Sequence, residues 1–249
     1  MSAALENLKR DIRMRLESDT IMSSTWLLIY LIPVISIVLM VLAAIASPFI
    51  GAGVILALWS ILIFVSLLSF IVSIVLTYKL VKRRNTHFQR QIFLFEDILS
   101  ILKEIMSKKE ASAEAEITTL ERTLRETKVE ETEKGAVLWA ILSAIIFIAS
   151  WYVYYFLMKD FYKHERREDM FFEDVSRILG KAGITFSVPR RVKPIPNRSF
   201  ILYLILTIIT AGIFGIYWLY ILLIDPNEHF KYHIELEDEL LKSLESGIA

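Results

Sequence analysis

The chain of 249 residues contains no cysteine. This excludes disulfide bonds, thiolate nucleophiles, iron–sulfur clusters and cysteine-based zinc sites. A net charge is also lacking, because 28 basic residues balance 28 acidic ones, whereas a nucleic-acid-binding protein needs a basic face. We therefore expect no nucleic-acid partner. Asparagine and glutamine are scarce beside glutamate, lysine and arginine, a bias typical of thermophilic prokaryotes, archaea among them.

Charged residues are missing altogether from four apolar runs, at residues 25–47, 51–77, 136–158 and 199–224. Each run is about as long as the roughly 20 residues that cross the hydrocarbon core of a bilayer. The charged residues 5–24 contain no short apolar region with a cleavage site, so they do not resemble a secretory signal. The runs predict an all-α, polytopic integral membrane protein with four hydrophobic helices and the lipid bilayer as its first partner.

A repeated spacing follows three of these runs. A tyrosine is followed nine residues later by a histidine, and nine and ten residues after that by two carboxylates. The copies are Tyr78, His87, Glu96 and Asp97; Tyr155, His164, Glu173 and Asp174; and Tyr220, His229, Asp238 and Glu239. Because the chain has only four histidines, the pattern indicates an internal repeat built from a membrane segment and a juxtamembrane amphipathic helix.

Helical geometry places each repeated histidine on an apolar stripe. Positions seven and eleven after a histidine lie within about 20° of it, whereas the position nine residues on points about 180° away. The stripe residues are Leu94 and Ile98, Phe171 and Val175, and Leu236 and Leu240. The first carboxylate of each copy therefore faces water, and no histidine forms a catalytic pair with it.

The favoured interpretation of these histidines is structural, with each ring bonded to a backbone carbonyl or a neighbouring polar group. It implies no metal, no other cofactor and no catalytic residue. A metal site would require the three histidines to converge, with Asp160, Asp225 or Glu168 completing the coordination shell. A pH-sensing role is a further alternative, because histidine titrates near neutrality.

The segments between the runs carry their own helical signals. Apolar residues at three- and four-residue steps predict an amphipathic helix at 5–16 that lies on the membrane, and a helical hairpin at 85–134 that stands off it. The first helix echoes the second arm of that hairpin, which suggests two larger halves. Asp225, Pro226 and Glu228 have the pattern of a helix start. The predicted domains are residues 1–84, 85–134, 135–198 and 199–249.

The most distinctive stretch is Thr-Ala-Gly-Ile-Phe-Gly-Ile-Tyr-Trp-Leu-Tyr at residues 210–220. It resembles the signature of a prokaryotic membrane family catalogued as domain of unknown function 4234, with Phe214 where that family often has tyrosine. The resemblance covers residues 198–220 and implies no activity or catalytic residues. Gly212 and Gly215 are expected to permit close helix packing; a functional break in the span is the alternative.

The charge distribution and the number of apolar runs predict different topologies. The basic residues Lys79, Lys82, Arg83 and Arg84 place the end of the second run, the N-terminus and residues 85–134 in the cytoplasm. Four crossings, the favoured arrangement, would then put the basic segment 159–198 outside. The alternatives are that the third or fourth run dips into the membrane and returns, the fourth being the better candidate, or that the units are inverted repeats.

These features favour a non-enzymatic membrane scaffold or accessory subunit that packs with a protein partner or with copies of itself. The alternative is a small transporter or channel with a polar path formed by hydroxyl groups. The candidate hydroxyls are Ser36, Ser60, Ser66, Ser69, Ser73, Ser143, Ser150, Thr207 and Thr210. An enzyme is the least favoured class, since no convergent acid, base and nucleophile is evident.

Overall fold

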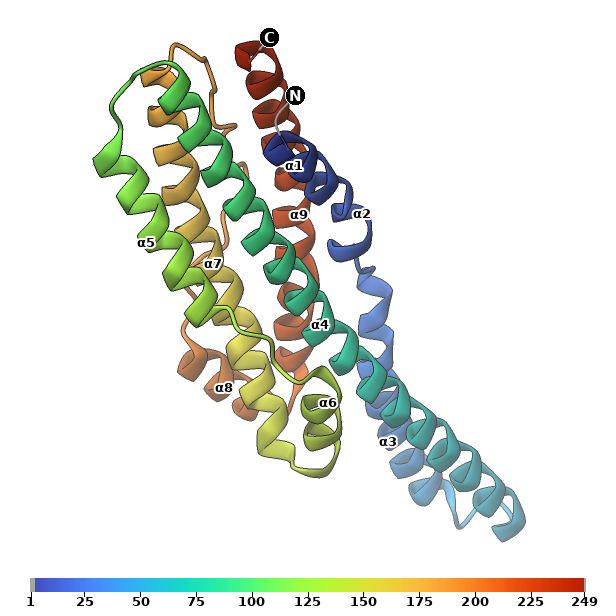
Figure 1. Cartoon of the computed structure of the whole chain (residues 1–249). Coiled ribbons are helices and arrows are strands. Elements are labelled where there is room, and N and C mark those ends of the chain that lie inside the picture. The colour runs from blue at the N-terminus through green and yellow to red at the C-terminus, as the bar shows by residue number, and fades with distance from the viewer. Residues whose placement is uncertain (1–2, 249) are drawn as a thin grey trace.

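A computed structural model describes residues 3–248, and this part of the chain is helical without any strand (Figure 1). Its elements are α1 (Ala3–Arg13), α2 (Arg15–Ser18), a 3₁₀ turn η1 (Ser24–Leu27), α3 (Leu28–Ala46), α4 (Ala52–Lys108), α5 (Glu114–Glu130), α6 (Ala136–Ile145), α7 (Phe147–Lys181), α8 (Phe200–Ile209) and α9 (Ile213–Ile248). The all-α prediction is confirmed for the described residues.

The first two apolar runs form a hairpin between α3 and the first half of α4. Two segments, Ser24–Ala46 and Ala52–Lys108, are long and apolar enough to cross a membrane. Only 6% of the most apolar window of each is buried, so neither lies inside the core of the described bundle. An apolar surface of this extent needs a cover other than water.

The third and fourth runs are each broken into two helices, and four crossings are therefore not confirmed. The third run bends at Ile146, whose extended backbone (φ −118°, ψ 103°) separates α6 from α7. Both α6 and α8 have ten residues, a length of about 15 Å, which is half of the roughly 30 Å hydrocarbon core. Figure 1 shows each short helix turning back into the long helix that follows it.

The turn between α8 and α9 explains the sequence around Gly212. The amide of Gly212 donates to the carbonyl of Thr207 (2.8 Å) and that of Ala211 to Ile208 (3.1 Å), the pattern of a Schellman helix end. Gly212 has φ +92°, and a Cβ there would meet no atom within 4 Å, so the expectation that it packs closely is wrong. Gly215 does allow a close approach, since a Cβ there would lie 3.4 Å from Thr207 Cγ2.

Because each hairpin turns back, the long helices α4, α7 and α9 run in the same direction, from the apolar end of the molecule to the opposite end (Figure 1). Two large apolar cores lie along them, together with a small third cluster of Phe88, Phe161, Ile195 and Phe230. One, near the hairpins, contains Leu76, Val153 and Trp218, and the other, farther along, contains Leu94 and Phe171 among its members. A polar layer lies between the two cores at residues 82–91, 159–169 and 225–233.

Three predicted features are corrected by this packing. The helix at the N-terminus does not lie on a membrane surface: α1 packs on α4 and buries Leu5, Leu8 and Ile12 in the second core. The hairpin at 85–134 is not separate, because its apolar stripes also enter that core. No helix starts at Asp225, since α9 continues through Pro226 and Asp225 instead pairs with Arg198.

Candidate metal centre

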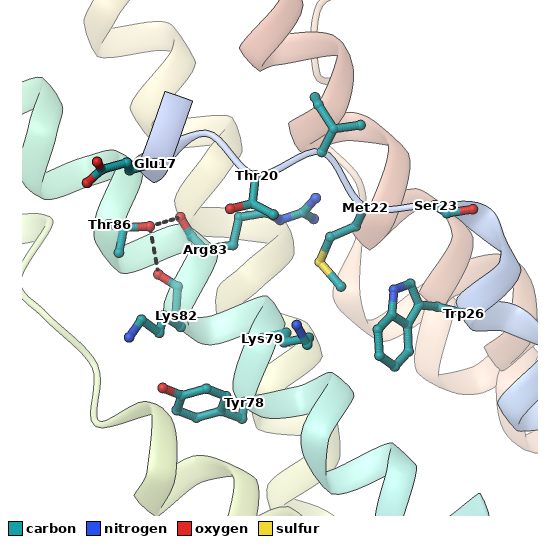
Figure 2. Close-up of a pocket in the computed structure, with 11 residues that line it drawn as sticks. Glu17, Thr20, Met22, Ser23, Trp26, Tyr78, Lys79, Lys82, Arg83 and Thr86 are labelled. Carbon is teal, nitrogen blue, oxygen red and sulfur yellow. Dashed lines mark hydrogen bonds between the residues drawn. The ribbon is translucent and has the colours of Figure 1, made fainter. Parts of the chain in front are cut away.

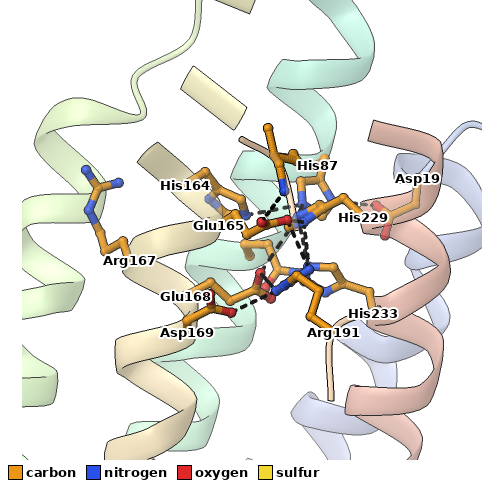
Figure 3. A network of polar contacts seen from close by, with 12 residues as sticks. Asp19, His87, His164, Glu165, Arg167, Glu168, Asp169, Arg191, His229 and His233 are labelled. Atoms are coloured by element: carbon orange, nitrogen blue, oxygen red, sulfur yellow. Dashed lines mark hydrogen bonds and ion pairs between the residues drawn. The ribbon is translucent and has the colours of Figure 1, made fainter. Parts of the chain in front are cut away.

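The three repeated histidines meet in the polar layer, together with the fourth histidine, His233 (Figure 3). His87 comes from α4, His164 from α7, and His229 and His233 from α9. Every ring is at most 1% exposed, and one ring nitrogen from each lies within 4.8 Å of the others. All histidines of the chain thus form one buried cluster.

The repeat explains why the rings meet at one level. Each histidine follows the tyrosine of its repeat by nine residues, and the three helices run in the same direction (Figure 1). Equal spacing on parallel helices brings equivalent residues to the same height. His233 is four residues after His229 and so shares its helix face. His233 was not among the predicted site residues, although two histidines four residues apart on a helix are a known metal-binding pair.

Carboxylates fix the ring orientation of His87 and His164. Nδ1 of His87 lies 2.9 Å from Asp19 Oδ1, and Nδ1 of His164 lies 2.9 Å from Glu131 Oε2. An ionised carboxylate only accepts hydrogen bonds, so both Nδ1 atoms carry a proton, and in the neutral form of each ring the Nε2 atom presents a lone pair. The same carboxylate–histidine arrangement orients ligands in many metal sites.

These two carboxylates occupy equivalent places in the chain. Asp19 is the C-cap of α2 and Glu131 is the C-cap of α5, and each precedes an apolar hairpin. The predicted similarity between the N-terminal helix and the second arm of the hairpin therefore extends to Asp19 and Glu131, the carboxylates that contact His87 and His164.

The two histidine rings on α9 have a mixture of acidic and basic neighbours. Nδ1 of His233 lies 3.1 Å from Glu237 Oε1 and 3.0 Å from Gln91 Nε2. Nδ1 of His229 lies 3.3 Å from Glu165 Oε2 and 3.2 Å from a guanidinium nitrogen of Arg191. The contacts of His229 permit either tautomer.

The Nε2 atoms of the cluster point at one another. That of His87 lies 3.3 Å from His164 Nε2 and 3.1 Å from His229 Nε2, and the latter lies 3.1 Å from His233 Nε2. As neutral rings, His87 and His164 cannot hydrogen-bond through these atoms, because both Nε2 atoms are then acceptors. A cation between them removes the repulsion of the facing lone pairs. Zinc–nitrogen bonds of 2.0–2.1 Å in a tetrahedron separate the nitrogens by about 3.3 Å, close to these three distances, although the ligand atoms of the four rings spread over up to 4.8 Å.

Glu168 supplies a fifth donor beside the rings. Its Oε1 lies 2.7 Å from His233 Nε2 and its Oε2 lies 3.8 Å from His229 Nε2. The carboxylate is fully buried, and its Oε1 pairs with the ring of His233. Of the three acids predicted to complete a metal shell, Glu168 is the one at the cluster, whereas Asp160 pairs with Arg84 and Asp225 with Arg198.

Arginines hold the outer carboxylates in place. Arg90 bridges Asp19 (2.8 Å) and Glu237 (2.7 Å). Arg167 pairs with Glu131, and Arg191 contacts Glu165, Glu168 and Asp169 at 3.0–3.2 Å. Each of these arginines comes from a different segment of the chain, so the orientation of the histidines depends on the whole bundle.

Burial determines the charge of the rings. It lowers the pKa of His87 to about 3, against the attraction of Asp19, and it holds the pKa of His229 well below the usual range. Both rings are therefore neutral at pH 7, the form in which histidine binds metals. For His233, burial also disfavours the charge, but Glu168 and Glu237 outweigh it and raise the pKa to about 9. A metal ion at the cluster competes with that proton.

The ligand chemistry restricts the metal. Four imidazoles with a neighbouring carboxylate suit zinc, copper, iron or nickel, whereas magnesium and calcium prefer oxygen ligands. Aromatic rings surround the cluster, with Phe88 4.4 Å from the His164 ring and Phe230 4.6 Å from the His87 ring between centroids. Such a closed, lined site is typical of a structural metal rather than a catalytic one with an open position.

The other residues of the repeat lie away from the cluster. Tyr155 and Tyr220 are 39% and 40% exposed beside the apolar hairpins, and Tyr78 is half-buried at the equivalent place. The first carboxylates face outward, as the helical angles predicted, and Glu96 and Asp238 form ion pairs with Lys128 and Arg15. The remaining positions are Glu173, which is exposed, Asp97 and Glu239, which are half-buried, and Asp174, which is buried and paired with Arg177.

Comparison with known proteins identifies no relative: no family model matches the chain, and neither a curated protein nor a solved structure matches it. The resemblance to domain of unknown function 4234 stays a prediction.

Proposed function

We propose that this chain is a membrane-anchored metalloprotein whose four histidines bind one transition-metal ion, zinc being the first candidate. One observation carries the proposal: the Nε2 atoms of His87 and His164 face each other while carboxylates hold the protons on their Nδ1 atoms. Two buried acceptors that face each other without a proton or cation between them are costly, and a bound metal ion removes that cost.

The metal ion has a structural role in this proposal. It joins α4, α7 and α9 at a level where the packing is polar, between two apolar cores. Rings that are 1% exposed or less leave a substrate no access. The burial of the rings supports a non-enzymatic scaffold or accessory subunit, in which the ion holds together the part of the helical bundle beyond the apolar hairpins. A protein partner or a second copy of the chain remains part of the proposal.

In the proposed topology, the α3–α4 hairpin crosses the membrane, and the shorter hairpins α6–α7 and α8–α9 enter it to half its depth and return. All three histidine helices then project from one face. The basic residues Lys79 and Lys82 favour the cytoplasm for that face. This arrangement also places the basic segment 159–198 inside, which removes the conflict between the charge rule and the repeat.

Thiol labelling in intact cells tests the topology, and the chain has no native cysteine to interfere. Ser112→Cys and Glu173→Cys report on two exposed positions on opposite sides of the third run. We expect both to be protected from a membrane-impermeant maleimide until the cells are opened. Labelling of Glu173→Cys alone from outside would show that the third run crosses and would refute the proposal.

Metal analysis tests the site itself. The full chain is purified through an affinity tag without histidine and analysed by plasma mass spectrometry, and we expect about one transition-metal ion per chain. His87→Gln and His164→Gln should lose it, whereas Glu173→Gln, an exposed change on the same helix as His164, should keep it. Wild-type protein that neither contains nor takes up zinc, copper, iron or nickel would disprove the site.

A transporter or channel is the second candidate, and one observation favours it. A cavity of about 40 Å³ near the apolar hairpins is lined by hydroxyls that include Tyr30, Ser73 and Ser143, and Ser143 Oγ has no hydrogen-bond partner. It holds only about three water molecules. Other candidate hydroxyls, Thr207 and Thr210 among them, donate to carbonyls of their own helix. Ion flux in proteoliposomes that disappears in Ser143→Val would favour this candidate over the scaffold.

A further inference from the structure

A second candidate site lies at the junction of the polar bundle and the apolar hairpins. A pocket of about 560 Å³ opens between α4 and the segment that joins α2 to η1 (Figure 2). Its lining includes Trp26, Tyr78, Lys79, Lys82 and Arg83. The volume is within the range of small-molecule sites, and the lining combines three cations with two aromatic rings.

Arg83 is a buried cation without an anion. Its side chain is 3% exposed, and its guanidinium donates only to uncharged oxygens, those of Leu222 (2.8 Å) and Asn227 (2.9 Å) being the nearest. Its Nε has no partner at all. Burial without a counter-charge lowers the pKa of Arg83 to about 9.

Arg83 differs from the other buried arginines, which all form ion pairs. Arg84, Arg90, Arg167 and Arg191 each pair with one or more carboxylates. Within residues 3–248, neither Arg83 nor the exposed Lys79 and Lys82 takes part in an ion pair. Three cations therefore line one pocket, and none of them forms an ion pair with a carboxylate of the described residues.

Pro226 accounts for part of the position of Arg83, but not for its charge. Proline has no amide hydrogen, so the carbonyl of Leu222, four residues earlier, loses its partner within α9. Arg83 satisfies that carbonyl. A neutral donor would do the same at a lower desolvation cost, and the free Nε together with the two lysines still calls for an anion.

The location indicates which anion. Trp26 lies at the start of the first apolar run and Tyr78 just beyond the end of the second, the places that aromatic residues occupy at a membrane interface. Lys79 and Lys82 directly follow the apolar segment, as lysines that contact lipid headgroups do. Glu17 lies at the other end of the pocket, beyond Thr86 (Figure 2), so a phosphate is repelled from that end and attracted to Lys79 and Arg83.

We propose that this pocket binds the phosphate group of an anionic phospholipid, with Lys79, Lys82 and Arg83 facing the phosphate and Trp26 and Tyr78 beside the glycerol and upper acyl chains. The site is separate from the histidine cluster and does not depend on a bound metal.

The test uses the full chain in a neutral detergent and short-chain lipids below their micellar concentration. The probes are dihexanoylphosphatidylglycerol, dihexanoylphosphatidylcholine and inorganic phosphate, and the dissociation constant is measured by thermophoresis. We expect phosphatidylglycerol to bind at least about tenfold more tightly than phosphatidylcholine. The double substitution Lys79→Gln/Lys82→Gln should weaken the binding of phosphatidylglycerol by about 10- to 30-fold, because each lysine near an anionic headgroup increases the affinity roughly fivefold.

The control is Lys108→Gln/Lys109→Gln, which removes the same charge from exposed positions at the other end of α4 and should change the affinity less than twofold. Arg83→Gln, checked for folding by its circular dichroism, should lose binding as well. Competition by inorganic phosphate would support the site and show that free phosphate is also a ligand; its absence would assign the site to lipid. Equal binding of the two lipids, or unchanged binding by the lysine variant, would overturn the proposal.

Discussion

The substitution His87→Gln distinguishes a metal ligand from a histidine that merely fills the core. His87 is central to the cluster, because its Nε2 contacts the Nε2 atoms of both His164 and His229. Glutamine removes the imidazole ligand, while Asp19 keeps its ion pair with Arg90. The change therefore acts mainly on the affinity for the ion.

The magnitude follows from linkage. Zinc at 100 times its dissociation constant stabilises the wild-type fold by about 2.7 kcal/mol. For a chain of this length, 1 kcal/mol shifts the melting temperature by about 2–4 °C, so zinc should raise that of the wild type by about 5–11 °C. His87→Gln should lose most of this increase. In EDTA the substitution should cost little or even stabilise, because it removes the facing lone pairs.

The assay is thermal unfolding in detergent, followed by intrinsic tryptophan fluorescence, with zinc or EDTA and with Glu173→Gln as the control. Each protein is measured in both conditions, so the quantity of interest is the difference between the two shifts. A loss of stability in His87→Gln that is the same with zinc and with EDTA would show that the histidine only packs, and would refute the reasoning.

Three other substitutions test separate parts of the structure. Glu131→Gln removes the carboxylate that orients His164 and should weaken metal affinity by about 10- to 100-fold, measured by competition with a chelator; an unchanged affinity would show that Glu131 does not orient the ligand. Gly212→Ala forces a side chain onto a residue with φ +92° and should lower stability by about 1 kcal/mol, whereas Gly53→Ala, at the start of α4, should be neutral or stabilising; equal effects of the two would contradict the observed turn. Burial and a hydrogen bond with the nearby Asp11 raise the pKa of Asp97 to about 6, so its stabilising contribution is complete below pH 3.8 and is lost as the pH rises through 6. Asp97→Asn should therefore raise the melting temperature above pH 6 and leave it unchanged below pH 4. An increase in melting temperature that is the same at every pH would show that the titration of Asp97 is not its cause.

Much of the local structure could be predicted from the sequence. Runs without charged residues predicted the apolar segments, and the helical angles placed Leu94, Phe171 and Leu236 on the same face as the histidines, where the second core contains them. Outward-facing carboxylates such as Glu96 and Asp238 were predicted by the same angles. These properties depend on neighbours within a few turns of one helix, which is why periodicity reveals them.

The cluster itself required information that no single helix contains. His87, His164 and His229 meet only because the chain reverses at Ile146 and at Gly212, which makes α4, α7 and α9 parallel. With four straight crossings, His164 would lie on the opposite side of the membrane from His87. Whether a ten-residue apolar helix continues or turns back depends on a bend of one to three residues, and periodicity over longer windows does not detect it.

The sequence by itself thus determined that three helices of this protein carry a histidine nine residues after a tyrosine near the end of an apolar segment. Only the tertiary structure decided that these helices point the same way, that His233 joins them, and that Asp19 and Glu131 hold the rings. The physical reason is that spacing along a helix is a local property, whereas the direction of one helix relative to another is set by the turns and the packing of the whole chain.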